Sequence, residues 1–323
     1  MPTIAIDAHS GETGPTPAVR AAALISNTTS IDVLVVGQAN PIEAALGRCS
    51  YNPERLRIRG IENVADSLEE TVNRVVSGEA DAMVTASEST QTHRICGRLL
   101  RRVEGLGHSP MAAVVPTAPR PGNRDPFALI LDVGGEPDCT VDDLVAWARM
   151  GTAYASRISK VEAPTVGLLS TSSESNEGPS DVVAANKVLS ADPHLRFVGN
   201  IQGVDIPQGA ADVVVCDGFS GHLIVGLLGG IGDALMEAAR GAWTQRPTWR
   251  LGLRLLGGAV MHFKELTEHE SYGGAPLLGY DRIVICALPL SGSEALANAI
   301  KLAAKAHRED VVAAVTQSLD VAR

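Results

Sequence analysis

The sequence predicts an α/β fold, a three-layer sandwich built around a mainly parallel sheet. Short apolar runs alternate with longer stretches in which apolar residues recur at steps of three and four, a pattern typical of strands joined by helices. Hydrophobic residues make up 45% of the 323 residues, but aromatic residues only 3%. A core of small aliphatic side chains suits parallel strands that helices cover on both faces. We expect a single domain spanning residues 1–323.

The individual elements follow from these runs. The apolar runs expected to be strands are Thr3–Ile6, Asp32–Val36, Ala82–Thr85, Met111–Val115, Ala128–Asp132, Thr165–Leu169, Ala211–Cys216 and Ile283–Ala287. Apolar residues between Ile61 and Val76 share one helical face. Thr140 is expected to cap the helix that begins after it. One long helix or two joined helices are expected at Ser293–Leu319, and loops at Pro116–Pro126 and Ser170–Ser180.

Composition and charge exclude several classes of protein. The net charge of −10 disfavours general nucleic-acid binding. The five cysteines are scattered and form no CxxC pair, which indicates a reducing compartment and no structural zinc site. We expect no metal and no cofactor. We see no signal peptide and no apolar run of about 18 residues, so we expect a cytoplasmic protein that does not span a membrane.

The segment Asp212–His222 carries the strongest indication of a binding site. A run of β-branched residues ends at an Asp-Gly pair, two glycines frame Phe219 and Ser220, and a long apolar stretch follows. This order predicts a buried strand, a tight turn and the start of a helix. Backbone N–H groups and the helix dipole favour an anion at such a turn. Its candidate binding residues are Asp217, Gly218, Ser220 and Gly221.

This turn resembles the Asp-Gly-Phe-Thr-Gly-Asn signature of the PlsX family of acyl-ACP:phosphate acyltransferases. Further resemblances follow in order along nearly the whole chain, at Ile4–Ala8, Leu131–Gly134, Asp138–Cys139, Met150–Gly151 and Tyr272–Gly279. The resemblance implies a fold similar to phosphotransacetylases and isocitrate dehydrogenases. It also implies a homodimer that contacts the membrane at its surface and transfers an acyl chain from acyl-carrier protein to phosphate without a metal.

The resemblance also implies a set of substrate-binding residues at strand ends. Besides those of the Asp217–Gly221 turn, they are Asp7, Ser10, Gly11, Ser87, Glu88, Ser89 and Thr90. Alternatives from general physical chemistry remain open. Asp7 can simply cap the turn after its strand, and residues 88–90 can cap the next helix. We expect His9 to be exposed and inert, and Cys216 and Cys286 to lie in the core.

The chain departs from the family pattern at polar positions. Glu88 and Glu136 stand where the family has Asn, Glu177 and Cys286 where it has Lys, and His222 where it has Asn. If these residues line one cleft, their combined charge opposes phosphate binding. The departures predict weak or absent phosphate-dependent activity. His222 and Glu177 are the candidate catalytic acid and base.

Three functions remain open after these departures. The first is a divergent phosphate acyltransferase, the second an enzyme with altered acyl-transfer chemistry, and the third a non-catalytic protein that binds acyl-carrier protein or regulates a homologue. We expect part of 223–270, an amphipathic helical protrusion, to lie at the dimer interface. Within it, Trp249–Phe263 either contacts a membrane or packs in an interface or core.

Overall fold

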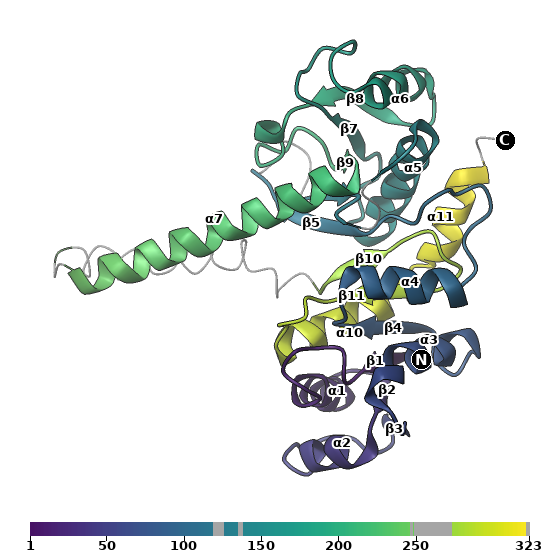
Figure 1. Ribbon diagram of the computed structural model, residues 1–323, viewed down its shortest axis with the longest axis vertical. Coiled ribbons are helices and arrows are strands. Elements are labelled where there is room, and N and C mark those ends of the chain that lie inside the picture. Colours follow the sequence, from purple (N-terminus) through teal and green to yellow (C-terminus); the bar gives the residue numbers. More distant parts are fainter. Residues whose placement is uncertain (119–125, 135–137, 246–247, 249–272, 321–323) are drawn as a thin grey trace.

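The computed structural model describes residues 1–118, 126–134, 138–245, 248 and 273–320. Its strands form two sheets (Figure 1). The six-stranded sheet contains, in spatial order, β10 (Ala275–Leu277), β11 (Ile283–Cys286), β4 (Ala82–Thr85), β1 (Thr3–Asp7), β2 (Asp32–Gly37) and β3 (Leu56–Gly60). The five-stranded sheet contains β5 (Ala112–Pro116), β6 (Phe127–Leu131), β9 (Val213–Val215), β7 (Thr165–Leu169) and β8 (Arg196–Ile201).

Each sheet is parallel except for one edge strand. β10 pairs antiparallel with β11, and β5 pairs antiparallel with β6. These two edge strands face each other, because Met111, just before β5, forms an antiparallel bridge with Leu277 of β10. The predicted α/β fold with mainly parallel strands is confirmed, with its strands divided between two sheets that meet at their antiparallel edges.

Helices cover both faces of the six-stranded sheet. Ile4 and Ile6 of β1 belong to one hydrophobic cluster, whereas Ala5 between them belongs to a second, because successive side chains of a strand point to opposite faces. The first cluster contains residues of α1 (Thr16–Thr28), α2 (Ala39–Leu46) and α10 (Ser293–Arg308). The second contains residues of α3 (Ser67–Val76) and α4 (Ser89–Leu99).

The five-stranded sheet is covered in the same way. One face packs against α5 (Val141–Ile158) and α6 (Ser180–Ala191). On the other face lie Ile224, Val225 and Leu228 from the start of α7 (Gly218–Gln245). The helix α11 (Val311–Asp320) follows α10 directly and packs against α5, so Ser293–Leu319 is two joined helices.

Most local predictions are confirmed. The helix expected between Ile61 and Val76 is a short 3₁₀ turn, Val64–Asp66, followed by α3. A second 3₁₀ turn lies at Gly203–Asp205. The chain at Ser170–Ser180 is a loop up to the first residue of α6, and most of Pro116–Pro126 lies outside the described residues.

The long helix α7 extends away from the rest of the molecule (Figure 1). Its segment Gly218–Thr244 is long and apolar enough to cross a membrane, judged by length and composition alone. The segment is not an unbroken apolar run, because Asp233, Glu237 and Arg240 interrupt it, so the expectation of no apolar run of about 18 residues is not contradicted. A single helix of this kind is weak support for a membrane span, because the core helix of a soluble protein passes the same test. The segment Trp249–Phe263 lies outside the described residues.

Candidate functional site

The predicted turn Asp217–Gly221 connects the end of β9 to the start of α7. One carboxylate oxygen of Asp217 accepts a hydrogen bond from the Ser220 N–H at 2.8 Å, and the other accepts from the Ser220 hydroxyl at 2.7 Å. Asp217 therefore caps the helix. Among the residues that the structure describes, the N–H groups of Gly218 and Phe219 have no hydrogen-bond partner, so they remain available to an anion at the positive end of α7.

This turn lies directly against the end of β6. An ideal Cβ atom on Gly221 would lie 1.8 Å from the carbonyl oxygen of Asp132, so the helix backbone approaches the strand more closely than any other residue allows. The exposed ring of His222 lies beside Gly134, whose ideal Cβ atom would lie 3.2 Å from the His222 Nδ1 atom. The segments Leu131–Gly134 and Asp217–His222, which are distant in sequence, are therefore in contact.

Several carboxylates influence the pKa of Cys139, which lies between β6 and α5 in the chain. Burial, and then the charges of Asp217, Asp143, Asp181 and Asp132, raise the pKa of the Cys139 thiol to about 12. A thiol with this pKa is protonated at neutral pH and is a poor nucleophile. The charges of the Asp217 turn, of Asp132 after β6 and of Asp143 at the start of α5 therefore all act on this thiol.

A second group of predicted residues lies at the carboxyl end of the six-stranded sheet. Asp7 is only 3% exposed and accepts hydrogen bonds from the Ser67 hydroxyl, the backbone N–H of His9 and the Thr85 hydroxyl. Burial raises the pKa of the Asp7 carboxyl above its usual value, and these hydrogen bonds oppose the rise. Asp7 therefore fixes the turn after β1, as the capping alternative proposed.

The loops around Asp7 are joined to one another. The Ser10 hydroxyl donates to the Asp7 carbonyl at 3.1 Å and accepts from the Ala86 N–H at 2.7 Å. The buried Ser87 donates its N–H to the Thr85 hydroxyl. Gly11 lies close to the carbonyl oxygen of Pro289. The ends of β1, β4 and β11 are thus held together by their own polar groups.

His9 differs from its prediction. It is half-buried rather than exposed, and its Nε2 atom accepts a hydrogen bond from the Gln38 N–H at 2.9 Å. Its ring packs so closely on Gly37 that an ideal Cβ atom there would lie 2.7 Å from the ring. Burial lowers the pKa of His9. The expectation of an exposed His9 was wrong because the end of β2 lies directly beside it.

The acidic departures from the family pattern are mostly solvent-exposed. Glu88 and Thr90 are exposed and Ser89 is half-buried. Glu88 occupies the cap position of α4, but its side chain makes no capping hydrogen bond. Glu177 is exposed in the loop before α6. Glu136 lies outside the described residues.

The two cysteines predicted to be core residues are confirmed. Cys216 is 3% exposed and Cys286 is 6% exposed. Burial raises the pKa of both thiols. Cys286 therefore removes the family's positive charge without introducing a reactive group.

The structure also contains a cavity of about 20 Å³, which has room for about one water molecule. It is lined by Tyr154 and by residues of β10, β11, α10 and α11. None of the predicted site residues lines it, so it is not the site that the sequence indicates.

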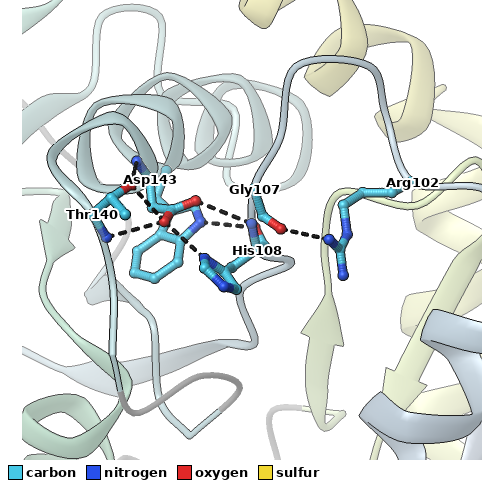
Figure 2. A network of polar contacts seen from close by, with 6 residues as sticks. Arg102, Gly107, His108, Thr140 and Asp143 are labelled. Carbon is cyan, nitrogen blue, oxygen red and sulfur yellow. Dashed lines mark hydrogen bonds and ion pairs between the residues drawn. The ribbon is translucent and has the colours of Figure 1, made fainter.

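An Asp–His pair that the sequence did not reveal lies at the start of α5 (Figure 2). Asp143 is 2% exposed. One of its oxygens lies 2.8 Å from the His108 Nδ1 atom and accepts from the Thr140 hydroxyl at 2.7 Å; the other accepts from the His108 N–H at 3.0 Å. The predicted cap at Thr140 is confirmed, because its hydroxyl accepts from the Asp143 N–H and completes a capping box. That signal predicted Thr140 but gave no indication of His108.

A substitution at Asp7 separates its structural role from a catalytic one. The pKa of Asp7 is higher in the folded protein than in the unfolded chain, where it is about 3.9. Protonated Asp7 therefore contributes its full stabilisation below about pH 3.9, and this contribution is lost as the pH rises through the folded-state pKa. We expect Asp7→Asn to remove this loss, so that the variant gains unfolding free energy relative to the wild type between pH 4 and pH 7.

Urea denaturation across that pH range measures the difference. The exposed Glu54→Gln is the matched control and should show no such pH-dependent gain. A constant difference between Asp7→Asn and the wild type at every pH would contradict the raised pKa.

Comparisons with known proteins agree with these motifs. A phosphate acyltransferase from Desulfitobacterium hafniense is 34% identical over 94% of this chain and 93% of its own length. One from Synechocystis sp. is 30% identical over 98% and 93%. The phosphotransacetylase EutD from Staphylococcus aureus, although only 14% identical, has a similar fold, with a TM-score of 0.61 over 94% of each chain.

The match to a family model extends over almost the entire chain. The model of the fatty acid synthesis protein family matches residues 2–314. These residues include both groups of predicted site residues, around Asp7 and around Asp217. The chain therefore belongs to the fatty acid synthesis protein family, which is the PlsX family that its motifs resemble.

Proposed function

We propose that this protein is a phosphate acyltransferase, which transfers an acyl group from acyl-carrier protein to inorganic phosphate. One observation carries the proposal: a chain of this family ends its central strand β9 in a capped turn whose N–H groups at Gly218 and Phe219 are unpaired among the described residues. Ligands of parallel α/β folds bind outside the carboxyl ends of the strands, which is where this turn lies.

The reaction places particular demands on this turn. An oxygen of phosphate attacks the thioester carbonyl, and negative charge develops on the carbonyl oxygen before the thiolate leaves. Backbone N–H donors at the start of a helix stabilise phosphate or that oxyanion without reorganising. Asp217 holds Ser220 and so fixes the direction of the first turn of α7. No resident metal is required by this chemistry.

Because Glu88 and Glu177 are exposed, they repel phosphate less strongly than the sequence analysis assumed. Two unit charges 4 Å apart interact by about 4 kcal/mol at an effective dielectric of 20, but by only about 1 kcal/mol in water. Both side chains are exposed, so the second value is the more relevant. We therefore infer weakened phosphate affinity with retained catalysis, in preference to a non-catalytic role.

We further propose a homodimer formed through α7. Along this helix Leu223, Leu227, Ile231 and Leu235 follow one another at every fourth position and are 48–65% exposed. Such a row lies on one side of a helix, and a second copy of the same helix is a suitable cover for it. We place the protein in the cytoplasm. Peripheral membrane contact through Trp249–Phe263 remains a proposal on residues outside the described ranges.

Release of free thiol from an acyl thioester tests the proposed function. We expect release from acyl-acyl-carrier protein to require phosphate, and acyl-coenzyme A to be a poorer donor. Thiol release without phosphate would indicate a thioesterase. Tight binding of acyl-acyl-carrier protein with no release would indicate the non-catalytic alternative.

A further inference from the structure

The orientation of His108 is set by the carboxylate beside it. The ionised Asp143 accepts hydrogen bonds, so the proton of a neutral imidazole lies on Nδ1, 2.8 Å from the carboxylate oxygen. Its Nε2 lone pair then points away from Asp143, and none of the residues that the structure describes donates a hydrogen bond to it. The His108 side chain is 37% exposed, whereas that of Asp143 is 2% exposed. A buried carboxylate that orients an accessible imidazole is the arrangement of a general base.

The backbone around the pair is fixed independently of the imidazole. The Trp147 indole N–H donates to the His108 carbonyl at 3.2 Å, and the Arg102 guanidinium donates to the Gly107 carbonyl (Figure 2). The His108 N–H already binds Asp143. The loop is therefore held on α5 by backbone contacts, and Thr140 and Asp143 together cap that helix through the capping box. Neither structural task requires the imidazole.

The pair lies beside the candidate site on the five-stranded sheet. His108 precedes β5, whose first residue pairs with the last residue of β6. Met111, three residues after His108, donates its N–H to the Asp132 carboxylate at 2.8 Å, and the Asp132 carbonyl oxygen lies against Gly221 of the Asp217 turn. The His108 loop and the Asp217 turn therefore both contact the residue that follows β6. Burial raises the pKa of the Asp143 carboxyl, but hydrogen bonds from His108 and Thr140 outweigh burial and leave that pKa below its usual value. Asp143 is therefore ionised at neutral pH.

We propose that His108 is the proton-transferring catalytic residue of the acyl transfer and that Asp143 is its positioning residue. This inference rests on the proposed phosphate acyltransferase function. Monohydrogen phosphate attacks the thioester carbon through one oxygen, forming a C–O bond. The C–S bond breaks and its electron pair goes to sulfur. The proton of the phosphate passes to Nε2 of His108 and then to the thiolate, giving acyl phosphate and free thiol.

Two substitutions at His108 distinguish the roles of its Nδ1 and Nε2 atoms. His108→Asn retains an amide N–H near the position of Nδ1, so it preserves the contact with Asp143 but has no Nε2. His108→Gln places its amide near Nε2, but an amide does not take up the proton. General acid–base catalysis contributes about 100- to 10,000-fold. We expect both variants to lose kcat within that range, with thermal unfolding of His108→Asn close to that of the wild type.

Leaving-group dependence distinguishes proton transfer from a structural role. An aryl thiolate leaves without protonation, so the deficit of His108→Asn should shrink with an aryl thioester and remain large with the alkyl thioester of acyl-carrier protein. Asp143→Asn should also slow turnover of the alkyl thioester. The double variant Asp143→Asn/His108→Asn should be only slightly slower than His108→Asn alone, because the two residues act as a unit.

The outcomes separate this inference from the proposed function. Wild-type turnover that requires phosphate, together with the selective deficit of His108→Asn, is the expected result. Wild-type turnover with an equally active His108→Asn, or with the same deficit on both thioesters, overturns the role of His108 alone. A wild-type protein without phosphate-dependent turnover of either thioester overturns the proposed function and this assignment together.

Discussion

Replacing Gly221 with alanine is expected to lower the unfolding free energy by about 3 kcal/mol, at the upper end of the usual cost of overpacking, and to abolish acyl transfer. The added Cβ atom would lie 1.8 Å from the carbonyl oxygen of Asp132 and 3.0 Å from the Cys216 sulfur. The nearest atom belongs to the backbone at the end of β6, which is fixed by pairing with β5 and β9. The start of α7 must therefore move away from the strand, and the candidate anion site moves with it.

Gly226→Ala is the matched control on the same helix. An ideal Cβ atom on Gly226 has no neighbour within 4 Å, so alanine there should stabilise the protein by up to about 1 kcal/mol through helix propensity. Urea denaturation and phosphate-dependent turnover measure both variants. Equal stability of the two variants, or an active Gly221→Ala, would mean that α7 does not approach β6 this closely.

A change from dimer to monomer is the second large effect that we expect. Replacing Leu227, Ile231 and Leu235 with glutamine should prevent association at micromolar concentration. These side chains are 48–65% exposed in the single chain, and full burial of each contributes about 1.5–3 kcal/mol. Losing several kcal/mol raises a dissociation constant by more than about 1,000-fold. Glutamine preserves helix propensity, so α7 should remain helical.

Light scattering or sedimentation measures the mass in solution of the wild type and of the triple variant. Glu237 and Arg240 form an exposed ion pair on α7 at 3.2 Å, and replacing both with glutamine is the control, which should remain dimeric. A monomeric wild type, or a triple variant that is still dimeric, would show that this row of side chains is not the dimer interface.

The fold was predictable to the extent that its strands are apolar on both faces. Among the central strands, β4 is buried throughout and β1 is buried from its second residue, Ile4, to Asp7. The strands missed by the sequence analysis, β3, β8 and β10, lie at sheet edges, and β3 and β8 are partly exposed to water. In β3, arginines alternate with Leu56 and Ile58, and β10 is a three-residue strand with a proline at its centre. The division into two sheets was not predictable, because it depends on which edges pair rather than on any local pattern.

The site was predictable where chemistry is local in sequence. The turn at Asp217 and the cap at Thr140 are each formed by residues within three positions of one another. The pairing of His108 with Asp143 joins residues 35 positions apart, and nothing in either segment alone indicates it. Solvent exposure was also not predictable from the sequence. The charge of Glu177 can be read from the sequence, but its exposure cannot. Exposure decides how strongly that charge opposes phosphate binding.

The product of the reaction tests the central proposal most directly. Full-length protein is incubated with acyl-acyl-carrier protein and inorganic phosphate, and the phosphorus-containing species are followed by ³¹P NMR. We predict a new acyl phosphate resonance that requires protein, thioester and phosphate together, and that disappears when hydroxylamine converts the product to a hydroxamate. An unchanged phosphate spectrum, with the thioester either intact or hydrolysed to free acid, would contradict the assignment of this chain as a phosphate acyltransferase.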